Sequence, residues 1–450
     1  MTDFINLQLG WPSPSLFPAS QLLEGASNVL KSEDKTAAAL VYGPDAGYEP
    51  ARVSIAEWLT ATYSVGSPIT ADRICVSNGA SANLHNILAK FTEPGYTRRV
   101  WMVEPSYFLA CPIFTDAGFQ GRLRGVPEDE EGLDIEYLRD ALSKVEQETN
   151  PEKPTLKTGP RHGKIYKHII YAVPTFANPS GKTMSLARRQ DLVRLAREFD
   201  ALVVTDDVYD ILRWPKVKGQ DASKLGAVPP RIVGVDRKLD GGPQDEWGNS
   251  VSNGSFSKII APGVRTGWAE ATPAFALALS TVGSTGSGGC PSQIAATFVQ
   301  EMIASGKLQS HIQDVLIPTY SSRYYTMMQA IETELLPLGF EISTGKPYEA
   351  EPGASQAVAV AGGYFTYLTV PAGLPVGKLA QLALEQHNLK FANGGMMTVE
   401  GDDGCAERAK NGFGNGIRLC WAWHTEEKIC EGITRLANLV KNMKAVEQLR

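Results

Sequence analysis

The sequence predicts an α/β fold with a largely parallel sheet that helices cover on both faces. Between residues 74 and 235, short runs rich in Val and Ile alternate with longer amphipathic segments. Such alternation is typical of strand-helix-strand units, because parallel strands need a crossover connection and are buried on both faces. The chain has 450 residues, of which 43% are hydrophobic, and this is enough to build a large core and two or three domains.

The expected elements of this part follow one another closely. In parallel sheets, active-site residues gather where strands end and helices begin, so the residues that follow each strand are of most interest. The predicted strands are residues 74–77, 100–104, 169–173, 202–205 and 232–235, and the predicted helices are residues 53–63, 81–91, 107–117 and 185–199.

The two ends of the sequence depart from this rhythm. Residues 6–20 are rich in Pro and apolar residues, which favours an extended arm. A long amphipathic helix is expected over residues 312–335, with a kink at Pro318, and strands are expected at 364–370 and 416–421. We therefore predict three parts: residues 1–45, an N-terminal arm with part of a small domain; residues 46–310, a large domain; and residues 311–450, a small C-terminal domain.

Composition and charge exclude several classes of function. The isoelectric point near 5.7 and the lack of a Lys/Arg run argue against nucleic acid as a partner. No apolar stretch reaches the roughly 18 residues that a membrane span needs, and residues 1–17 lack the basic residues of a targeting signal. The six cysteines are scattered, without a C-x-x-C pair or a His at ligand spacing, so we expect no metal site, no disulfides and a cytoplasmic location.

One segment combines a lysine and an arginine without an acid nearby. Residues 252–268 read Ser-Asn-Gly-Ser-Phe-Ser-Lys-Ile-Ile-Ala-Pro-Gly-Val-Arg-Thr-Gly-Trp. Lys258 and Arg265 suit a phosphate, and a desolvated lysine can also attack a carbonyl. An exposed loop would also contain such residues. A third interpretation, the Ser-x-x-Lys motif of acyl enzymes, also needs a later Lys-Thr-Gly, which occurs only upstream at residues 157–159.

Polar residues follow other predicted strands as well. Asn78, Gly79, Ala80 and Ser81 join a strand to a helix, where free backbone N–H groups form an anion site or a plain helix cap. Asp206 and Asp207 end a strand, and adjacent buried acids need a cationic partner. Conversely, Arg418 lies between apolar residues in a strand and needs a carboxylate.

These motifs together resemble those of fold-type I pyridoxal-phosphate enzymes. The lysine segment, Asn-Pro-Ser-Gly at residues 178–181 and Asp-Asp-Val-Tyr at residues 206–209 are similar to those of class I and II aminotransferases of the aminoadipate/kynurenine type. Asp207 replaces the usual Glu of the family, which leaves its role open. The resemblance extends from Tyr42 to Arg418. It implies a homodimer in which a mostly parallel seven-stranded sheet, flanked by helices, forms the large domain beside a smaller α+β domain.

The resemblance also implies a role for each matching residue. Lys258 would carry pyridoxal 5'-phosphate and move a proton, Asp206 would face the pyridine nitrogen, and Tyr107 would stack on the ring. Asn178 and Tyr209 would bind the ring oxygen. The phosphate would be held by Ala80, Ser81, Ser255, Ser257 and Arg265, with Tyr42 of the neighbouring subunit, and the substrate carboxylate by Gly10, Asn178 and Arg418.

The reaction that the resemblance implies is the transfer of an amino group between an amino acid and a 2-oxo acid. The same cofactor residues also serve lyases and synthases, which decarboxylate, eliminate, substitute or form carbon-carbon bonds, so these remain an alternative. A cofactor-binding regulator is a third hypothesis. The short stretch before Tyr42 speaks against it, since we expect no DNA-binding segment there.

The substrate side chain is predicted from the N-terminal arm. The arm contains Trp11, Leu16 and Phe17 but no Arg or Lys, whereas a second carboxylate usually needs a cationic partner. Arg408 and Lys410 belong to the Gly- and Asp-rich segment 394–416, which we expect to be a mobile lid with solvated charges. We therefore expect an aromatic or otherwise apolar amino donor.

Three further segments are expected to be connections. Residues 149–164 and 236–250 are rich in Gly, Pro and charge and are expected at the surface. The Gly-rich residues 283–289 do not form the G-x-G-x-x-G pattern of a dinucleotide site. They are expected to form a flexible bend between two helices, near the dimer interface by resemblance.

Overall fold

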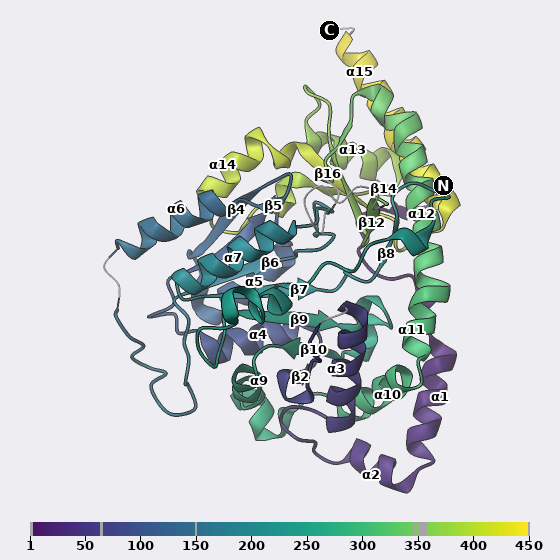
Figure 1. The fold of residues 1–450 in the computed structure, drawn as a ribbon. Helices are drawn as coiled ribbons and strands as arrows, with labels where there is room; N and C mark the ends of the chain where they lie inside the picture. The colour runs from purple at the N-terminus through teal and green to yellow at the C-terminus, as the bar shows by residue number, and fades with distance from the viewer. Residues whose placement is uncertain (1–2, 64–65, 149–150, 346–347, 349–357, 449–450) are drawn as a thin grey trace.

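The chain is built around a central sheet of eight strands in the order β2-β10-β9-β7-β6-β3-β4-β5 (Figure 1). The computed structural model describes residues 3–63, 66–148, 151–345, 348 and 358–448. Neighbouring strands from β9 to β4 run parallel, whereas β10 is antiparallel to both of its neighbours. The strands are β2 (Ile74–Ser77), β3 (Arg99–Glu104), β4 (Leu123–Asp129), β5 (Gly132–Leu133), β6 (His168–Ala172), β7 (Ala201–Asp207), β9 (Ser250–Ser255) and β10 (Gly267–Glu270).

The mostly parallel sheet is confirmed, but the predicted count of seven strands is wrong. The additional strand is β5, which has two residues and pairs antiparallel with the end of β4. Residues 232–235 do not form a strand either. They belong to helix α8 (Ile232–Asp236), and β7 pairs directly with β9, so no strand lies between them. A short apolar run does not by itself distinguish a strand from a buried helix, which is why the prediction failed.

Helices cover both faces of the sheet, as predicted. Side chains of successive strand residues point to opposite faces, so Leu202 and Val204 pack on one side while Val203 packs on the other. The first side is covered by α4 (Ala80–Phe91), α5 (Cys111–Phe114) and α9 (Pro273–Ser280), and the second by α6 (Ile135–Glu146), α7 (Leu186–Glu198) and α8.

A second, antiparallel sheet has the strand order β11-β13-β16-β15. Its strands are β11 (Glu341–Ile342), β13 (Phe365–Thr369), β15 (Ala392–Asn393) and β16 (Gly416–Cys420). The helices in this part of the chain include α12 (Ile317–Ala330), α13 (Val376–His387), α14 (Asp403–Asn411) and α15 (Glu426–Gln448). Two small sheets link distant parts: β8 (Arg213–Pro215) pairs with β12 (Val360–Gly362), and β1 (Ile5–Asn6) pairs with β14 (Leu389–Lys390).

The N-terminal arm is extended only in its first part. After β1 it forms a 3-10 turn, η1 (Pro14–Leu16), and then α1 (Ala19–Leu30), α2 (Glu33–Leu40) and α3 (Glu49–Tyr63). Leu16 is buried in the main hydrophobic core, so it does not face a substrate. No helix in the described ranges is long and apolar enough to cross a membrane.

The predicted long helix begins earlier than expected. It runs from α11 (Lys307–His311) through α12 to Leu335, with π-helical turns at Ile312–Leu316 and Ile331–Leu335. The first of these turns lies immediately before Pro318 of α12, where a π-helical turn accommodates the missing N–H of the proline inside the helical run. The predicted boundary between residues 310 and 311 falls inside this helical run, and the three-part division stays a prediction.

Segment 394–416 is largely helical and not a Gly-rich loop. It contains η13 (Gly394–Met397), α14 (Asp403–Asn411) and η14 (Phe413–Asn415). Arg408 binds both carboxylate oxygens of buried Glu104, at 2.5 Å and 3.0 Å, and its Nη2 donates to the carbonyl of Gly125. The expectation that Arg408 is solvated is therefore wrong, because a buried carboxylate needs a cation. Lys410 is exposed, as expected.

The remaining connections mostly behave as predicted. Residues 151–164 lie at the surface, although the backbone N–H groups of Thr155, Leu156 and Lys157 donate to the carboxylate of Glu93. Thr149 and Asn150 lie outside the described residues. The segment 236–250 includes the short 3-10 turn η6 (Leu239–Gly241) and is mostly exposed in its middle, but Asp236, Asn249 and Ser250 at its ends are buried, so the predicted surface position holds only in part. Residues 283–289 include a π-helical turn, η9 (Thr285–Gly289), between α9 and α10 (Gln293–Ala304).

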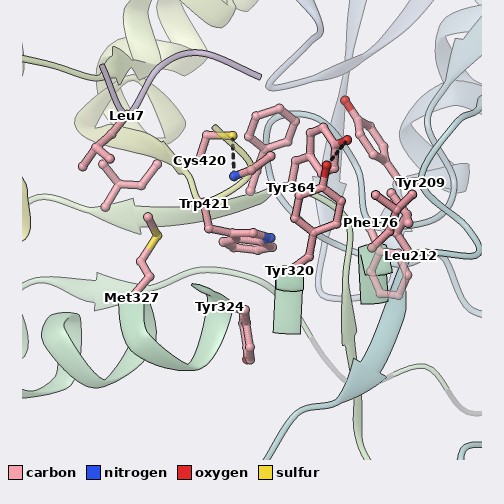
Figure 2. Packing of buried hydrophobic residues seen from close by; sticks show 14 of the residues in the cluster. Leu7, Phe176, Tyr209, Leu212, Tyr320, Tyr324, Met327, Tyr364, Cys420 and Trp421 are labelled. Carbon is pink, nitrogen blue, oxygen red and sulfur yellow. Dashed lines mark hydrogen bonds between the residues drawn. The ribbon is translucent and has the colours of Figure 1, made fainter. Parts of the chain in front are cut away.

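Buried aromatic residues connect the central sheet to the second sheet (Figure 2). Tyr209 follows β7 and lies 5.4 Å from Tyr364, measured between ring centroids. Tyr364 donates a hydrogen bond to the backbone oxygen of Lys258 at 3.1 Å, which leaves its own oxygen to accept from Tyr320 of α12 at 3.1 Å. The backbone at Lys258 is thus fixed from the C-terminal part of the chain.

Candidate active site

A cavity of about 410 Å³ opens where the carboxyl ends of the central strands meet the N-terminal arm and the second sheet. Parallel sheets bind ligands at this edge. Twelve of the thirteen residues predicted for the site line this cavity: Gly10, Ala80, Ser81, Tyr107, Asn178, Asp206, Tyr209, Ser255, Ser257, Lys258, Arg265 and Arg418. Residues that are up to 408 positions apart in the sequence are therefore brought together around one cavity.

Lys258 lies in a short 3-10 turn, η7 (Phe256–Lys258), directly after β9. Its Nζ donates to the backbone oxygen of Gly10 at 2.7 Å and lies 5.5 Å from the ring centroid of Tyr364. The pKa of Lys258 is lowered to about 8, mainly by burial; Arg418 and Arg265 contribute to the shift, while Cys420 and Asp206 oppose it. About a tenth of this amine is therefore neutral and nucleophilic at pH 7, far more than for a lysine of ordinary pKa.

The start of α4 and the segment around Arg265 form an anion cup. Gly79 precedes the helix with a positive φ of 92° and gives it no side-chain cap, so the first helical N–H groups remain available. Arg265 donates from Nη2 to the carbonyl of Asn78 at 2.9 Å and from Nη1 to Ser257 at 3.3 Å. A Cβ at Gly79 would lie 2.1 Å from Arg265 Nη2, so this close approach requires glycine.

Asp206 ends β7 and presents its carboxylate to the cavity. Its Oδ2 accepts a hydrogen bond from Tyr171 at 3.1 Å, while its Oδ1 is buried without a partner among the described residues. Burial raises the pKa of Asp206 to about 7, and Asp207 adds to the rise, whereas Tyr171 and Lys258 oppose it. A cation placed here would stabilise the ionised carboxylate.

Asp207 points away from the cavity. Its Oδ2 accepts from Ser252 at 2.6 Å and from Thr205 at 2.7 Å. Ser252 in turn accepts from Arg231, which forms a buried ion pair with Glu270. The role that the sequence left open for Asp207 is therefore that of a member of a buried network on the opposite face of the sheet.

Arg418, in β16, faces the cavity without a carboxylate partner in the described part of the chain. Its Nη1 donates to Asn178 Oδ1 at 2.5 Å and its Nη2 to the carbonyl of Gln8 at 2.7 Å, while its Nε is buried and unpartnered. The guanidinium carbon lies 4.1 Å from the ring centroid of Phe365. Burial lowers the pKa of Arg418, so an incoming carboxylate would relieve an electrostatic penalty.

Two tyrosines and an asparagine complete the walls. Tyr107 lies just after β3, and burial raises its pKa to about 12. Tyr209 is buried beneath the cavity, with its ring 5.8 Å from that of Phe365. Because Arg418 occupies the amide oxygen of Asn178, the amide nitrogen is the atom left to donate a hydrogen bond.

Tyr42 is the predicted site residue that the chain does not bring to the cavity. Its side chain is 84% exposed and lies beside Gly288 in the turn between α9 and α10. Within one subunit it therefore cannot contact the groups around Lys258.

The sequence reasoning missed four side chains that shape the site. Tyr171, which donates to Asp206, lies in an apolar strand, and its sequence context is the same as that of a tyrosine in the hydrophobic core. Phe365 and Lys390 belong to strands whose pairing depends on distant parts of the chain, and Phe108 follows Tyr107 without a polar signal. The backbone oxygen of Gln8 accepts a hydrogen bond from Arg418, and because every residue has such an oxygen, the sequence does not reveal this contact.

Comparison with known proteins identifies the family to which this site belongs. The model of the family "Aminotransferase class I and II" matches residues 15–342. The match covers more than half of the chain, and the chain belongs to this family.

Individual relatives agree over nearly the full length. The chain is 31% identical over 441 residues to aromatic-amino-acid aminotransferase 1 of Thermococcus litoralis, covering 98% of this chain and 88% of the relative. It is 35% identical over 420 residues to an uncharacterised protein of Saccharomyces cerevisiae, covering 89% of each. The solved structure of Pyrococcus horikoshii kynurenine aminotransferase, a complex with PMP, matches with a TM-score of 0.75 and 25% identity over 98% of this chain and 92% of the other.

The chain is therefore an aminotransferase of fold-type I that exchanges an amino group between an amino acid and a 2-oxo acid. Its cofactor is pyridoxal 5'-phosphate. The residues present fit that group, because the cavity offers a neutral-prone amine, an anion cup and a carboxylate with an unpartnered oxygen. The predicted enzyme class and cofactor are confirmed.

Proposed function

We propose that the cavity around Lys258 binds the cofactor and transfers the amino group of an aromatic or otherwise apolar amino acid. The observation that carries this proposal is the meeting of one amine, one carboxylate, an anion cup and a guanidinium in a single cavity. Each of these groups matches one part of the cofactor or the substrate, and none of the cations has a carboxylate in hydrogen-bond contact within the described residues.

When bound, pyridoxal 5'-phosphate supplies an aldehyde and a ring that accepts electrons. Lys258 would attach to the aldehyde, and the carboxylate of Asp206 would stabilise a positive charge on the ring nitrogen. Tyr107 would stack on the ring, while Asn178 and Tyr209 would bind the ring oxygen. The phosphate would be held by the N–H groups and hydroxyls of Ala80, Ser81, Ser255 and Ser257 and by the guanidinium of Arg265.

The substrate is oriented by Arg418 and by the backbone at Gly10. A guanidinium binds a carboxylate through two parallel hydrogen bonds, which fixes the direction of the substrate as well as its position. The free amine of Lys258 would act as the base that accepts the proton of the substrate α-carbon. Its lowered pKa favours this role, because a neutral amine can accept that proton.

The mouth of the cavity supports an apolar donor. Trp11, Phe108 and Leu109 line it, and Trp11 and Leu109 remain 58% and 56% exposed. An aromatic or branched apolar side chain would cover part of this surface and gain roughly 25 cal/mol per Å² of buried apolar area. Of the arm residues named from the sequence, only Trp11 contributes to this wall, since Leu16 is buried and Phe17 lies outside the cavity.

Tyr42 supports a homodimer with shared sites. Its exposed ring adjoins other exposed apolar residues, among them Leu40 and Val41, at 63% and 60% exposure. A second subunit would bury this surface and bring Tyr42 to the phosphate of its neighbour. We further propose that the dimer is cytoplasmic and that its subunits divide into the three parts expected from the sequence.

The shared site is tested with a heterodimer of one Tyr42→Phe chain and one Lys258→Ala chain. If each subunit lends Tyr42 to the other, both lesions fall in one site and the other site is intact, so the heterodimer keeps about half of the activity. If Tyr42 serves its own subunit, both sites are damaged and the heterodimer is inactive. Inactive heterodimers would contradict the proposal.

The reaction is tested by absorbance spectroscopy of the cofactor-loaded protein with single amino acids. Phenylalanine or leucine should convert the visible band of the lysine-bound cofactor to the pyridoxamine form, and a 2-oxo acid should reverse the change. Release of carbon dioxide or ammonia without this conversion would instead indicate the lyase or synthase alternative.

A further inference from the structure

One cation of the active-site cavity has no role in the proposed function. Lys390 ends β14, which pairs with β1 of the N-terminal arm, and its backbone oxygen accepts from the N–H of Leu7 at 2.8 Å. Lys390 lines the same cavity as Lys258 and Arg418 and is exposed at its mouth. Its ammonium group forms no hydrogen bond or ion pair with any residue in the described ranges.

The charges of the cavity leave Lys390 without a counter-charge. Among the described lining residues, four side chains are cationic and one, Asp206, is acidic. In the proposed function, Lys258 binds the aldehyde, Arg265 the phosphate and Arg418 the α-carboxylate, while Asp206 faces the ring nitrogen. Neither the cofactor nor the groups that all amino acids share therefore supply a negative charge for Lys390. The remaining source of such a charge is the side chain of the substrate.

The sheet register places Lys390 at a useful distance from Arg418. Ala392 lies directly opposite Arg418 across β15 and β16, and Lys390 is two residues earlier in the chain. At this point Leu7 of the arm lies between the two strands, since it donates to the carbonyl of Lys390 and accepts from the N–H of Cys420. With a rise of about 3.3 Å per residue and two strand spacings of about 4.8 Å, the Cα atoms of Lys390 and Arg418 lie roughly 12 Å apart. The two extended side chains can each cover roughly 6 Å of this distance. The carboxyl carbons of an extended five-carbon diacid are four bonds, or roughly 5 Å, apart, so Lys390 can reach the second carboxylate of such a molecule bound to Arg418.

A transaminase must accept two different side chains in one cavity, one in each half of its cycle. Here one wall is apolar, with Trp11, Phe108 and Leu109, while another carries Lys390. Apolar and anionic side chains can thus be bound by different walls without a change of the main cavity.

We infer that Lys390 binds the side-chain carboxylate of a five-carbon dicarboxylic co-substrate. The inference rests on the proposed function. The exchange is balanced, because the donor gives its amino group and α-hydrogen to the acceptor and receives the carbonyl oxygen, and no oxidant is needed. Lys390 is then a specificity-determining residue, since it distinguishes the diacid from substrates that lack a second carboxylate.

The experiment compares half-reaction rates per concentration for glutamate and phenylalanine in the cofactor-loaded wild type and in Lys390→Met. A charge-assisted hydrogen bond is lost only for glutamate, so the ratio of the glutamate rate to the phenylalanine rate should fall roughly tenfold to a hundredfold. Lys390→Arg keeps a cation and should restore most of the ratio. Lys378→Met, which removes an exposed lysine from α13, is the matched control and should leave the ratio unchanged.

Two results would overturn the inference. One is a Lys390→Met protein whose rates for glutamate and phenylalanine fall by the same factor, which would mean that Lys390 merely supports the fold of the arm. The other is a protein in which both rates stay at the wild-type value. A wild type that transaminates neither amino acid would refute the proposed function itself. Failure of the proposed function can therefore be distinguished from failure of the inference about Lys390.

Discussion

Two adjacent carboxylates at the end of β7 lie on opposite faces of the central sheet. Asp206 shares its face with Leu202 and Val204, lines the cavity and receives one hydrogen bond, from Tyr171. Asp207 shares its face with Val203 and receives hydrogen bonds from Ser252 and Thr205. The alternation of side chains along a strand is sufficient to send the two acids into opposite environments.

The two faces differ in how their charges are compensated. Behind the sheet, Arg231 pairs with Glu270, stacks over Tyr63 at 4.3 Å and lies close to Asp207, and all of these residues are buried. In the cavity, Lys258, Arg265 and Arg418 contact carbonyl, hydroxyl and amide oxygens and no carboxylate of the described residues. In the first arrangement Arg231 is paired with a carboxylate without a ligand, which stabilises the fold, although Asp207 Oδ1 and Arg231 Nε have no hydrogen-bond partner among the described residues. The second is incomplete and is suited to the phosphate and carboxylates that the enzyme binds.

The largest effect is expected behind the sheet. Glu270→Gln leaves Arg231 with an uncompensated buried charge, so the free energy of unfolding should fall by about 3–5 kcal/mol. Glu198→Gln is the control, because it removes the partner of Arg139 in an exposed pair and should cost less than about 1 kcal/mol. Urea denaturation of both cofactor-free variants measures the difference. Equal losses in the free energy of unfolding would show that the buried ion pair stabilises the fold no more than the exposed one.

A smaller effect, on rate, distinguishes the two acids directly. Asp206→Asn removes the carboxylate that faces the ring nitrogen, so activity per mole of bound cofactor should fall roughly a hundredfold, or by about 3 kcal/mol of barrier. Asp207→Asn should lose much less activity by this measure, because its partners are structural. Equal losses of kcat in the two variants would contradict the assignment of opposite roles.

The smallest effect concerns the pH at which Lys258 reacts. In the cofactor-free protein its pKa of about 8 lies below the usual value of 10.5, because burial disfavours the charged form. The neutral amine therefore predominates above pH 8 and is lost as the pH falls below it. Reductive methylation at pH 8, followed by peptide mass spectrometry, should label Lys258 about tenfold faster than a lysine of ordinary pKa, after allowance for the weaker nucleophilicity of a less basic amine. A labelling midpoint near 10.5 would contradict this environment.

Much of the fold and most of the candidate site could be predicted from the sequence, because the patterns that indicate them lie within short stretches of the chain. The apolar runs that became β6 and β7 are long enough to identify strands, and the residues that follow them lie at the edge where parallel sheets bind ligands. The segment around Lys258 carries its motif within a few residues, so no tertiary information was needed to find it.

The errors come from contacts that are distant in the sequence. Arg408 was expected in solvent, but its partner Glu104 lies 304 residues earlier. Lys390 reaches the cavity only because the two-residue strand β14 pairs with β1, and two residues carry no periodicity. Residues 232–235 form a helix because the neighbouring position in the sheet is already occupied by β9, which a local apolar run cannot reveal.

The most direct measurement of the account is the identity of the lysine that carries the cofactor. Borohydride reduction of the pyridoxal-phosphate-loaded protein fixes the link between them, and peptide mapping then locates the modified residue. We predict a single pyridoxyl group on the peptide that contains Lys258, and none on that peptide in Lys258→Ala. A pyridoxyl group on any other lysine of the wild type would contradict the claim that the cavity between β9, the N-terminal arm and β16 is the active site.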